Sequence, residues 1–138
     1  MSGALVPVAF AKRMKLPARF CRAFSCAVAT ATDLAGLQGY AAVADRILFD
    51  AKAPKDATRP GGLGLSFDWR LLQNLDLKIP FMVSGGLDAD NVADALRTMR
   101  ADGVDVSSGV ESAPGVKDTA LIAAFFKAVS RAVAGRAA

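Results

Sequence analysis

The sequence predicts an α/β fold with a parallel sheet, because short apolar runs alternate along the chain with amphipathic segments. Two of these apolar runs end in small residues that leave backbone N–H groups open, at residues 80–87 (PFMVSGGL) and 103–111 (GVDVSSGVE). Turns of this kind after buried strands commonly hold phosphate. The loops after strands seven and eight of a (β/α)8 barrel often form such a site, so we interpret the two runs as the last two units of a barrel.

At 138 residues the chain is long enough for one domain with a core. A whole barrel typically needs about 200–250 residues. We therefore expect a single domain over residues 1–138, the C-terminal half of a TIM barrel: about four parallel βα units, strands five to eight, preceded by one helix. The apolar fraction of 53% argues against disorder, and no apolar run is long enough to span a bilayer.

In the first half of the chain we predict, in order, a helix over residues 5–15, a strand over 19–27, a helix over 30–40 and a strand over 46–51. Pro7 suits the first turn of the first helix. Thr30 or Thr32 is expected to cap the second helix, with Asp33 placed favourably in its first turn. The second strand, RILFDA, is expected to be buried and ends in a carboxylate, Asp50.

A loop rich in Pro, Gly and Lys over residues 52–66 leads into the second half of the chain. There we predict a short helix over residues 67–75, a strand over 81–84, a helix over 88–99, a strand over 103–107 and a helix over 118–133. Asp88 or Asp90 is expected to cap the middle helix, and Asp118 the last. The apolar side chains of the last helix are expected to point inward: Leu121, Ile122, Phe125, Phe126 and Val129.

The net charge of +4 is unevenly distributed, because five Lys and Arg residues precede the first acidic residue, Asp33. We interpret this basic stretch as one helix with a solvated face, followed by a strand. An organelle transit peptide and a nucleic-acid-binding arm are the two alternatives. On the favoured interpretation, we expect neither a nucleic-acid partner nor a membrane partner.

The chain has two cysteines, Cys21 and Cys26, and no histidine. The lack of histidine excludes most zinc sites and any histidine-based catalytic triad. A single C-x4-C pair is weak evidence for a disulfide, so we expect reduced thiols and a cytoplasmic protein. We expect neither a metal nor another cofactor.

Candidate functional groups follow the strands, because ligands of parallel βα folds bind at the carboxyl ends of the strands. These groups are Cys26, Asp50, the triplet Ser84-Gly85-Gly86, and Asp105 with Ser107-Ser108-Gly109. Asp50 is the sharpest candidate, since burial at the end of an apolar strand would raise its pKa toward the range of a general acid. Alternatively, Asp50 caps a turn or pairs with Lys52.

The glycine-rich stretch Gly61-Gly62-Leu63-Gly64 has neither Walker nor dinucleotide-binding spacing. It is either a flexible loop or a substrate-binding lid beside Asp50, with Gly62 and Gly64 as its binding residues. Asp105 is either a substrate-positioning carboxylate or a salt-bridge partner. Phe67 and Trp69 are expected to pack in the core.

Several motifs occur along the chain in a characteristic order: LFDAKAP, a Gly-Gly-x-Gly loop, FDW, PF-x-x-SGGL with Asn-Val after it, and GVDVSSGVE followed by PGVKD. In this order they resemble phosphoribosylanthranilate isomerase, an enzyme of tryptophan biosynthesis. The similarity is clearest over residues 46–126 and extends by spacing to about Ala4. It implies a cofactor-free isomerase that converts an aminoaldose phosphate to an aminoketose phosphate by an Amadori rearrangement.

The resemblance also implies residue roles. It places the general acid, which opens the ribose ring to a Schiff base, on Asp50 at the end of strand six. It makes Asp105 the carboxylate that positions the ribosyl part. It places the substrate phosphate on the last two turns, at Gly85, Gly86, Ser107, Ser108 and Gly109.

Parts of the family pattern do not occur in this chain, among them the general base and the arginine near strand two that meets the anthranilate carboxylate, and the Gln-Leu-His-Gly of strand four is reduced to Met1-Ser2-Gly3. The general base of the family is a Cys in a Lys-x-Cys-Gly motif, which is absent from the 138 residues. Cys26 belongs to the unit that corresponds to strand five, far from strand one, so we do not expect it to replace that base. We therefore expect a truncated or split isomerase, or alternatively a catalytically incompetent phosphate-binding half barrel or remnant. Exposed strand edges would favour self-association or a complementary N-terminal half.

Overall fold

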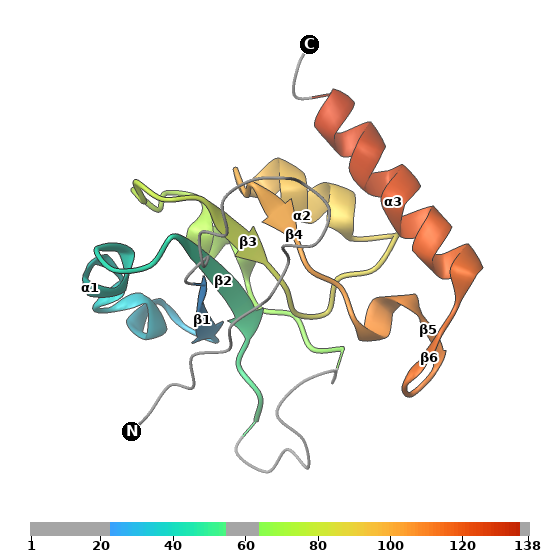
Figure 1. Ribbon diagram of the computed structural model, residues 1–138, viewed down its shortest axis with the longest axis horizontal. Coiled ribbons are helices and arrows are strands. Elements are labelled where there is room, and N and C mark those ends of the chain that lie inside the picture. The colour runs from blue at the N-terminus through green and yellow to red at the C-terminus, as the bar shows by residue number, and fades with distance from the viewer. Residues whose placement is uncertain (1–22, 55–63, 136–138) are drawn as a thin grey trace, which may run out of the picture.

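The computed structural model describes residues 23–54 and 64–135 of the chain (Figure 1). The helix expected over residues 5–15 and the first four residues of the strand expected over 19–27 lie outside the described residues. Cys21 and Gly62 lie outside them as well.

The described residues form a four-stranded parallel sheet in which each strand lies beside the strand that precedes it in sequence. Its strands are β1 (Ala23–Val28), β2 (Arg46–Ala51), β3 (Phe81–Val83) and β4 (Gly103–Val104). Successive strand–helix units produce a parallel sheet in chain order, because each crossover returns the chain to the end of the sheet where the previous strand began. The predicted α/β fold with a parallel sheet is confirmed.

The strands carry their pairing slightly past their assigned ends. β2 has the predicted bounds, whereas β3 is one residue shorter and β4 three residues shorter than predicted. The N–H of Ser84 nevertheless donates to the carbonyl of Phe49 at 2.7 Å, and the N–H of Asp105 donates to that of Val83 at 2.8 Å. Ser84 and Asp105 are thus fixed by the ladder although the strands have formally ended.

The helical elements are η1 (Ala31–Leu34), α1 (Leu37–Ala41), η2 (Trp69–Leu72), α2 (Val92–Thr98), η3 (Ser108–Val110) and α3 (Thr119–Ala134), where η denotes a 3-10 helix. The single helix predicted over 30–40 is wrong, because Gly36 adopts a φ of 80° and separates η1 from α1. A left-handed residue of this kind ends a helix. Thr30 is the N-cap of η1, as predicted.

Two later helices begin differently from their predictions. η2 is shorter than the predicted 67–75 and is capped by Asp68, whose carboxylate accepts from the N–H of Arg70. The N-cap of α2 is Asn91, so the prediction of Asp88 or Asp90 is wrong. Asp88 instead accepts from the N–H groups of Asp90 and Asn91 at 2.9 Å each, in the turn before the helix. Its short side chain suits such a turn.

Asp118 caps α3 as predicted, accepting from the N–H groups of Ala120 and Leu121. The inward orientation predicted for the apolar side chains is wrong at two positions: Leu121 and Phe126 are exposed, Phe126 to 66%. The buried stripe of this helix is narrower than the apolar stripe, and Phe125 is its most buried member.

A small antiparallel hairpin precedes α3 and was not predicted. It consists of β5 (Glu111–Ala113) and β6 (Val116–Lys117), with Gly115 at a φ of 80° in its turn. Pro114-Gly115 is a typical turn dipeptide and was the available signal. The hairpin lies between η3 and α3 (Figure 1).

One face of the sheet packs against the helices and forms the core. Val28, Ile47, Phe49 and Val83 have no exposed surface, and they cluster with side chains from α1, η2, α2 and α3. Phe67 is buried in this cluster and Trp69 packs against it, as predicted. The residues between them in the strands face the other side. A row in register there, Ser25, Leu48, Met82 and Gly103, remains at least partly exposed.

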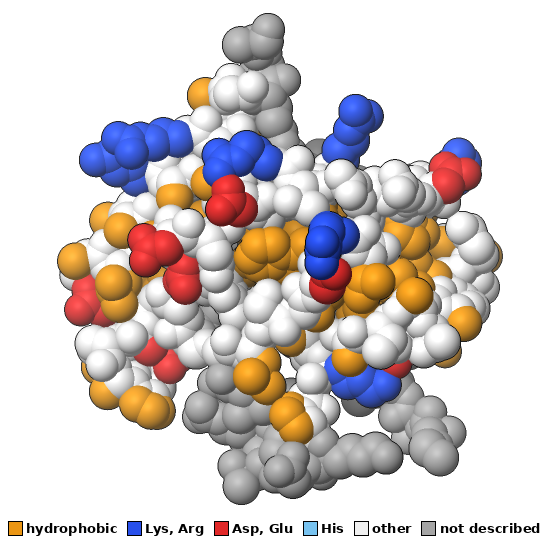
Figure 2. All heavy atoms as spheres, turned by 180° about the vertical axis from the view of Figure 1, so that it is seen from behind, with side chains coloured by type: hydrophobic (Ala, Val, Ile, Leu, Met, Phe, Trp, Pro, Cys, Tyr) orange, Lys and Arg blue, Asp and Glu red, His pale blue; other side chains and the backbone are white. Residues whose placement is uncertain are grey.

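The surface of the molecule is also partly apolar. Hydrophobic side chains gather across the middle of the side opposite to the view of Figure 1, between charged groups (Figure 2). Among the described helices, none combines the length and the apolarity needed to cross a lipid bilayer.

Candidate functional site

The carboxyl ends of the parallel strands surround a pocket of about 120 Å³. Eight of the residues singled out in the sequence line it: Asp50, Gly64, Ser84, Gly85, Gly86, Asp105, Ser107 and Ser108. The remaining lining residues are Ala51, Ala53, Leu65, Leu87 and Val106. Residues from four separate stretches of chain are therefore brought together at one end of the sheet, where parallel βα folds bind ligands.

Asp50 lies one residue before the end of β2, on the face of the sheet opposite to Phe49. It is half-buried, and its Oδ1 accepts a hydrogen bond from the N–H of Ala51 at 2.8 Å. Burial is the largest influence and raises the pKa of Asp50. The hydrogen bond from Ala51 acts in the opposite direction, whereas the charge of Asp105 raises the pKa further. Asp50 is thus a carboxyl group that retains its proton to a higher pH than usual.

The alternative pairing of Asp50 with Lys52 is wrong in this structure. The Nζ of Lys52 lies 2.5 Å from Oδ1 of Asp33, in the turn after β1. Asp50 therefore has no lysine partner among the described residues, and it has a hydrogen bond with the side chain of Ser84, which follows β3.

Ser84 connects the two carboxylates of the pocket. It is buried at 9% exposure, and its hydroxyl donates to Oδ2 of Asp105 at 3.1 Å. A hydrogen bond between Ser84 and Asp50 also lowers the pKa of Asp50 slightly. The sequence grouped Ser84 with the glycines after it, but the structure places its side chain between Asp50 and Asp105. Asp105 itself is exposed, and Ser84 is the hydrogen-bond partner that holds it.

The glycine turn after β3 depends on two left-handed residues. Gly85 and Gly86 have φ angles of 89° and 62°. A Cβ atom at Gly85 would lie 2.6 Å from the backbone nitrogen of Ala51, and one at Gly86 would lie 2.8 Å from the backbone of Leu65. Side chains are therefore excluded from both positions for steric as well as conformational reasons. As a result, the backbone of the turn itself forms this wall of the pocket.

The second turn, after β4, contains Ser107, Ser108 and Gly109. The two serines line the pocket, but Gly109 does not. Gly109 packs directly against the backbone carbonyl of Leu87, in the neighbouring turn. This contact brings the two turns close together, and the phosphate-binding role that the resemblance implies for Gly109 stays a prediction.

Lys117 is a cation near the pocket that the sequence analysis did not select. Its Nζ lies 2.9 Å from the backbone oxygen and 3.2 Å from the hydroxyl of Ser107, and 2.7 Å from Oε1 of Glu111. The PGVKD motif contains this lysine, so the signal was present. Lys117 ends β6, so the hairpin of β5 and β6 places its ammonium group against the turn that contains Ser107.

Cys26 lies apart from the pocket. Its register partner in β2 is Phe49, on the core side of the sheet, so it faces away from Asp50. Burial raises the pKa of its thiol, which donates to the backbone oxygen of Asp33 at 3.7 Å. The thiol is free and neutral in these surroundings. This agrees with the expectation that it does not act as a base.

Within residues 23–54 and 64–135, no three side chains of the ligating types cluster closely enough to hold a metal ion.

Two glycines were predicted to belong to a substrate-binding lid beside Asp50. Gly64 lines the pocket, whereas Gly62 lies outside the described residues.

Comparison with known proteins gives one consistent result. The family model for N-(5'phosphoribosyl)anthranilate (PRA) isomerase matches residues 9–128. The chain is 77% identical over 101 residues to the N-(5'-phosphoribosyl)anthranilate isomerase of Bradyrhizobium diazoefficiens, covering 73% of this chain and 45% of that protein. It is 73% identical over 101 residues to that of Rhodopseudomonas palustris, covering 73% of this chain and 46% of the relative. The chain thus spans about half the length of the curated relatives it matches.

Solved structures agree with this result. The chain superposes on phosphoribosylanthranilate isomerase from Thermotoga maritima with a TM-score of 0.64 and 35% identity, covering 78% of this chain and 50% of the other. Mutually generated monomers of the dimeric Thermotoga maritima protein give a TM-score of 0.66 at 32% identity, covering 81% and 50%. A complex of the isomerase with reduced 1-(o-carboxyphenylamino)-1-deoxyribulose 5-phosphate gives a TM-score of 0.62 at 31% identity, covering 78% and 47%.

Proposed function

Since the chain belongs to the N-(5'-phosphoribosyl)anthranilate isomerase family, we propose that it provides the general acid and the phosphate-binding turns of this isomerase of tryptophan biosynthesis. The observation that supports the proposal is the pocket at the strand ends. In it, a proton-retaining carboxyl group, Asp50, faces two turns of small residues across a space of about 120 Å³.

Asp50 is the proposed general acid. In its protonated form it donates to the ring oxygen of the ribose, the C1–O bond breaks, and the nitrogen lone pair forms the Schiff base. A base then removes the C2 proton, and the resulting enolamine relaxes to the aminoketose. A general acid works best when its pKa lies near the working pH, and burial moves Asp50 in that direction. Asp105, held by Ser84, is the proposed contact of the ribosyl hydroxyl groups.

The substrate phosphate is proposed to bind the backbone N–H groups of Gly85, Gly86, Ser107 and Ser108. Within the described residues, no backbone hydrogen bond occupies these four donors. Hydrogen bonds to a charged acceptor contribute about 1.5–3 kcal/mol each, so even two of them bind phosphate appreciably. Lys117, bonded to the carbonyl and hydroxyl of Ser107 and paired with Glu111, places an ammonium group next to this turn.

The proposed architecture is the C-terminal half of a (β/α)8 barrel, a single domain over residues 1–138. In support, the described sheet has the chain-order pairing of a barrel segment, with β1 and β4 as its edges. The structural relatives are matched over about half their length. Edge strands are templates for further pairing, so we propose that the half barrel associates with a second copy or with a complementary N-terminal half. The complementary half would supply the Lys-x-Cys-Gly base of the family.

The test is a fluorescence assay of phosphoribosylanthranilate turnover with three samples: this chain, the N-terminal half of the Bradyrhizobium diazoefficiens relative, and their mixture. We expect activity in the mixture only, and its loss in a mixture made with Asp50→Asn. Activity of the chain alone would overturn the half-barrel proposal. No activity in any sample, from a chain shown to be folded and mixed, would instead favour a phosphate-binding half barrel without catalysis.

A further inference from the structure

Lys52 lies close enough in sequence to the proposed acid, Asp50, for its charge to affect the pKa of that carboxyl group. It follows Asp50 by two residues, and its N–H continues the sheet ladder by donating to the carbonyl of Val28 at 3.0 Å. In extended chain, residues two apart lie on the same face. The flexible four-carbon stem of a lysine can therefore reach the carboxyl group of Asp50. A cation within about 4–6 Å lowers the pKa of a carboxyl group by about 1–3 units, which would ionise a general acid prematurely.

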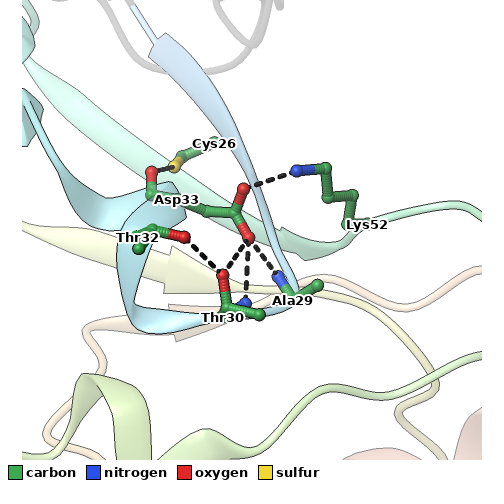
Figure 3. Close-up of polar contacts among 6 residues, drawn as sticks. All are labelled: Cys26, Ala29, Thr30, Thr32, Asp33 and Lys52. Carbon is green, nitrogen blue, oxygen red and sulfur yellow. Dashed lines mark hydrogen bonds and ion pairs between the residues drawn. The ribbon is translucent and has the colours of Figure 1, made fainter.

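The structure shows Lys52 held elsewhere. Its Nζ lies 2.5 Å from Oδ1 of Asp33, and the close-up in Figure 3 shows the side chain extended toward that carboxylate. The side chain of Lys52 is 52% exposed, whereas that of Asp33 is 15% exposed. The ion pair thus lies at the protein surface, and Asp33 is the less exposed of its two partners.

Asp33 is fixed because its second oxygen is fully used by the turn after β1. Oδ2 accepts from the N–H groups of Ala29 at 3.0 Å and Thr30 at 2.9 Å, and from the hydroxyl of Thr30 at 3.1 Å (Figure 3). These bonds leave Oδ1 oriented toward Lys52. The ion pair with Lys52 and the backbone donors hold the pKa of Asp33 well below its usual range, so the carboxylate stays charged at every working pH.

We propose that Asp33 is a positioning residue that withholds the ammonium group of Lys52 from Asp50, so that the acid keeps its proton. The inference rests on the proposed function, in which Asp50 is the general acid. Among the described residues, the groups that face Asp50 from the other elements supply no competing cation. Ala27 of β1 is its uncharged register partner, Ser84 follows β3, and Asp105 follows β4 and is anionic.

The test measures the protonation of Asp50 directly in the 138-residue chain, by NMR titration of ¹³C-labelled aspartate carboxyl groups. The resonance of Asp50 is assigned by its loss in Asp50→Asn. Asp33→Asn keeps an oxygen that accepts from Ala29 and Thr30 but loses the charge that holds Lys52. We expect the pKa of Asp50 to fall by about 1 unit in this variant, the low end for an opposite charge because Lys52 is half exposed.

Two further variants separate the proposed cause from a general disturbance. The double variant Asp33→Asn with Lys52→Met should return the pKa of Asp50 to within about 0.3 units of the Lys52→Met value, since the displaced cation is gone. Asp68→Asn removes another carboxylate that pairs with a basic side chain and accepts from a backbone N–H at the start of a 3-10 helix, and it should leave the pKa of Asp50 unchanged.

An unchanged pKa of Asp50 in folded Asp33→Asn would overturn the inference, as would an equal fall in the double variant. This readout needs no turnover. If the pKa shifts as expected while the complemented isomerase assay stays silent, the positioning role stands and the proposed function fails. If the assay succeeds and the pKa does not move, the reverse holds.

Discussion

Replacing Gly109 with alanine tests whether this glycine is structural. A Cβ atom there would lie 2.8 Å from the carbonyl carbon of Leu87 and 3.1 Å from the Cα of Asp88, closer than ordinary contacts, which begin at 3.4 Å. Both neighbours are backbone atoms, so no side-chain rotation relieves the overlap. Gly109 does not have a positive φ, so the cost arises from overlap alone. Overpacking of this kind costs about 1–3 kcal/mol, and we expect about 3 kcal/mol for a rigid backbone contact.

Urea unfolding followed by the fluorescence of Trp69, the single tryptophan, measures this cost. With a slope of about 2 kcal/mol per M, a loss of about 3 kcal/mol lowers the midpoint by about 1.5 M. Gly39→Ala is the matched control. Gly39 lies in α1 with no atom within 4 Å of a Cβ, so alanine should stabilise the protein by about 0.5–1 kcal/mol. A loss below about 1 kcal/mol in Gly109→Ala would refute the steric argument.

Three other predictions follow from the same geometry. Phe49→Ala should lower the free energy of unfolding by about 3–5 kcal/mol, because Phe49 is fully buried. Phe126→Ala, at a position that is 66% exposed, should change it by no more than about 0.5 kcal/mol. Equal losses in urea unfolding would contradict the core assignment. Since the pKa of Asp50 is raised above its unfolded value, its contribution to stability is complete below the unfolded pKa and is lost as pH rises through the folded pKa. Asp50→Asn should therefore abolish that loss, and parallel unfolding free energies of the two proteins from pH 3 to 8 would disprove it. Lys117→Met should weaken binding of inorganic phosphate, measured by calorimetry, by about fivefold to tenfold, whereas Lys78→Met, at an exposed ion pair elsewhere, should not.

The parts of the fold that the sequence predicted well are those with one dominant signal. β2 has the predicted bounds because its apolar run, residues 47–49, lies between two charged residues, Arg46 and Asp50, and Pro54 follows shortly after. Asp118 was correctly placed as a cap because it directly precedes a long helical pattern and Asp is among the preferred N-cap residues. The pocket was largely predicted for the same reason, since strand ends in parallel folds converge.

The parts that were missed depend on contacts between distant residues. Phe125 and Phe126 are neighbouring residues of the same type, so their hydrophobicity does not distinguish them. The packing of α3 against α2 determines that Phe125 is buried and Phe126 is exposed. Gly109 resembles a ligand-binding glycine in sequence, and its contact with Leu87 exists only in three dimensions. Lys52 follows Asp50 by only two residues, yet its partner is Asp33, nineteen residues away in the capping box of η1.

The ladder bonds that extend past β3 and β4 have a consequence for the variation this chain can tolerate. The backbone at the strand ends holds Asp50, Ser84 and Asp105 in the pocket. The residues directly before two of them, Phe49 and Val83, point to the opposite face and fill the core. Losing a single residue within β2 would exchange the two faces, placing a carboxylate among apolar side chains and a phenylalanine ring in the pocket. Length changes should therefore be confined to the connections between strands, and each strand should vary only by substitution.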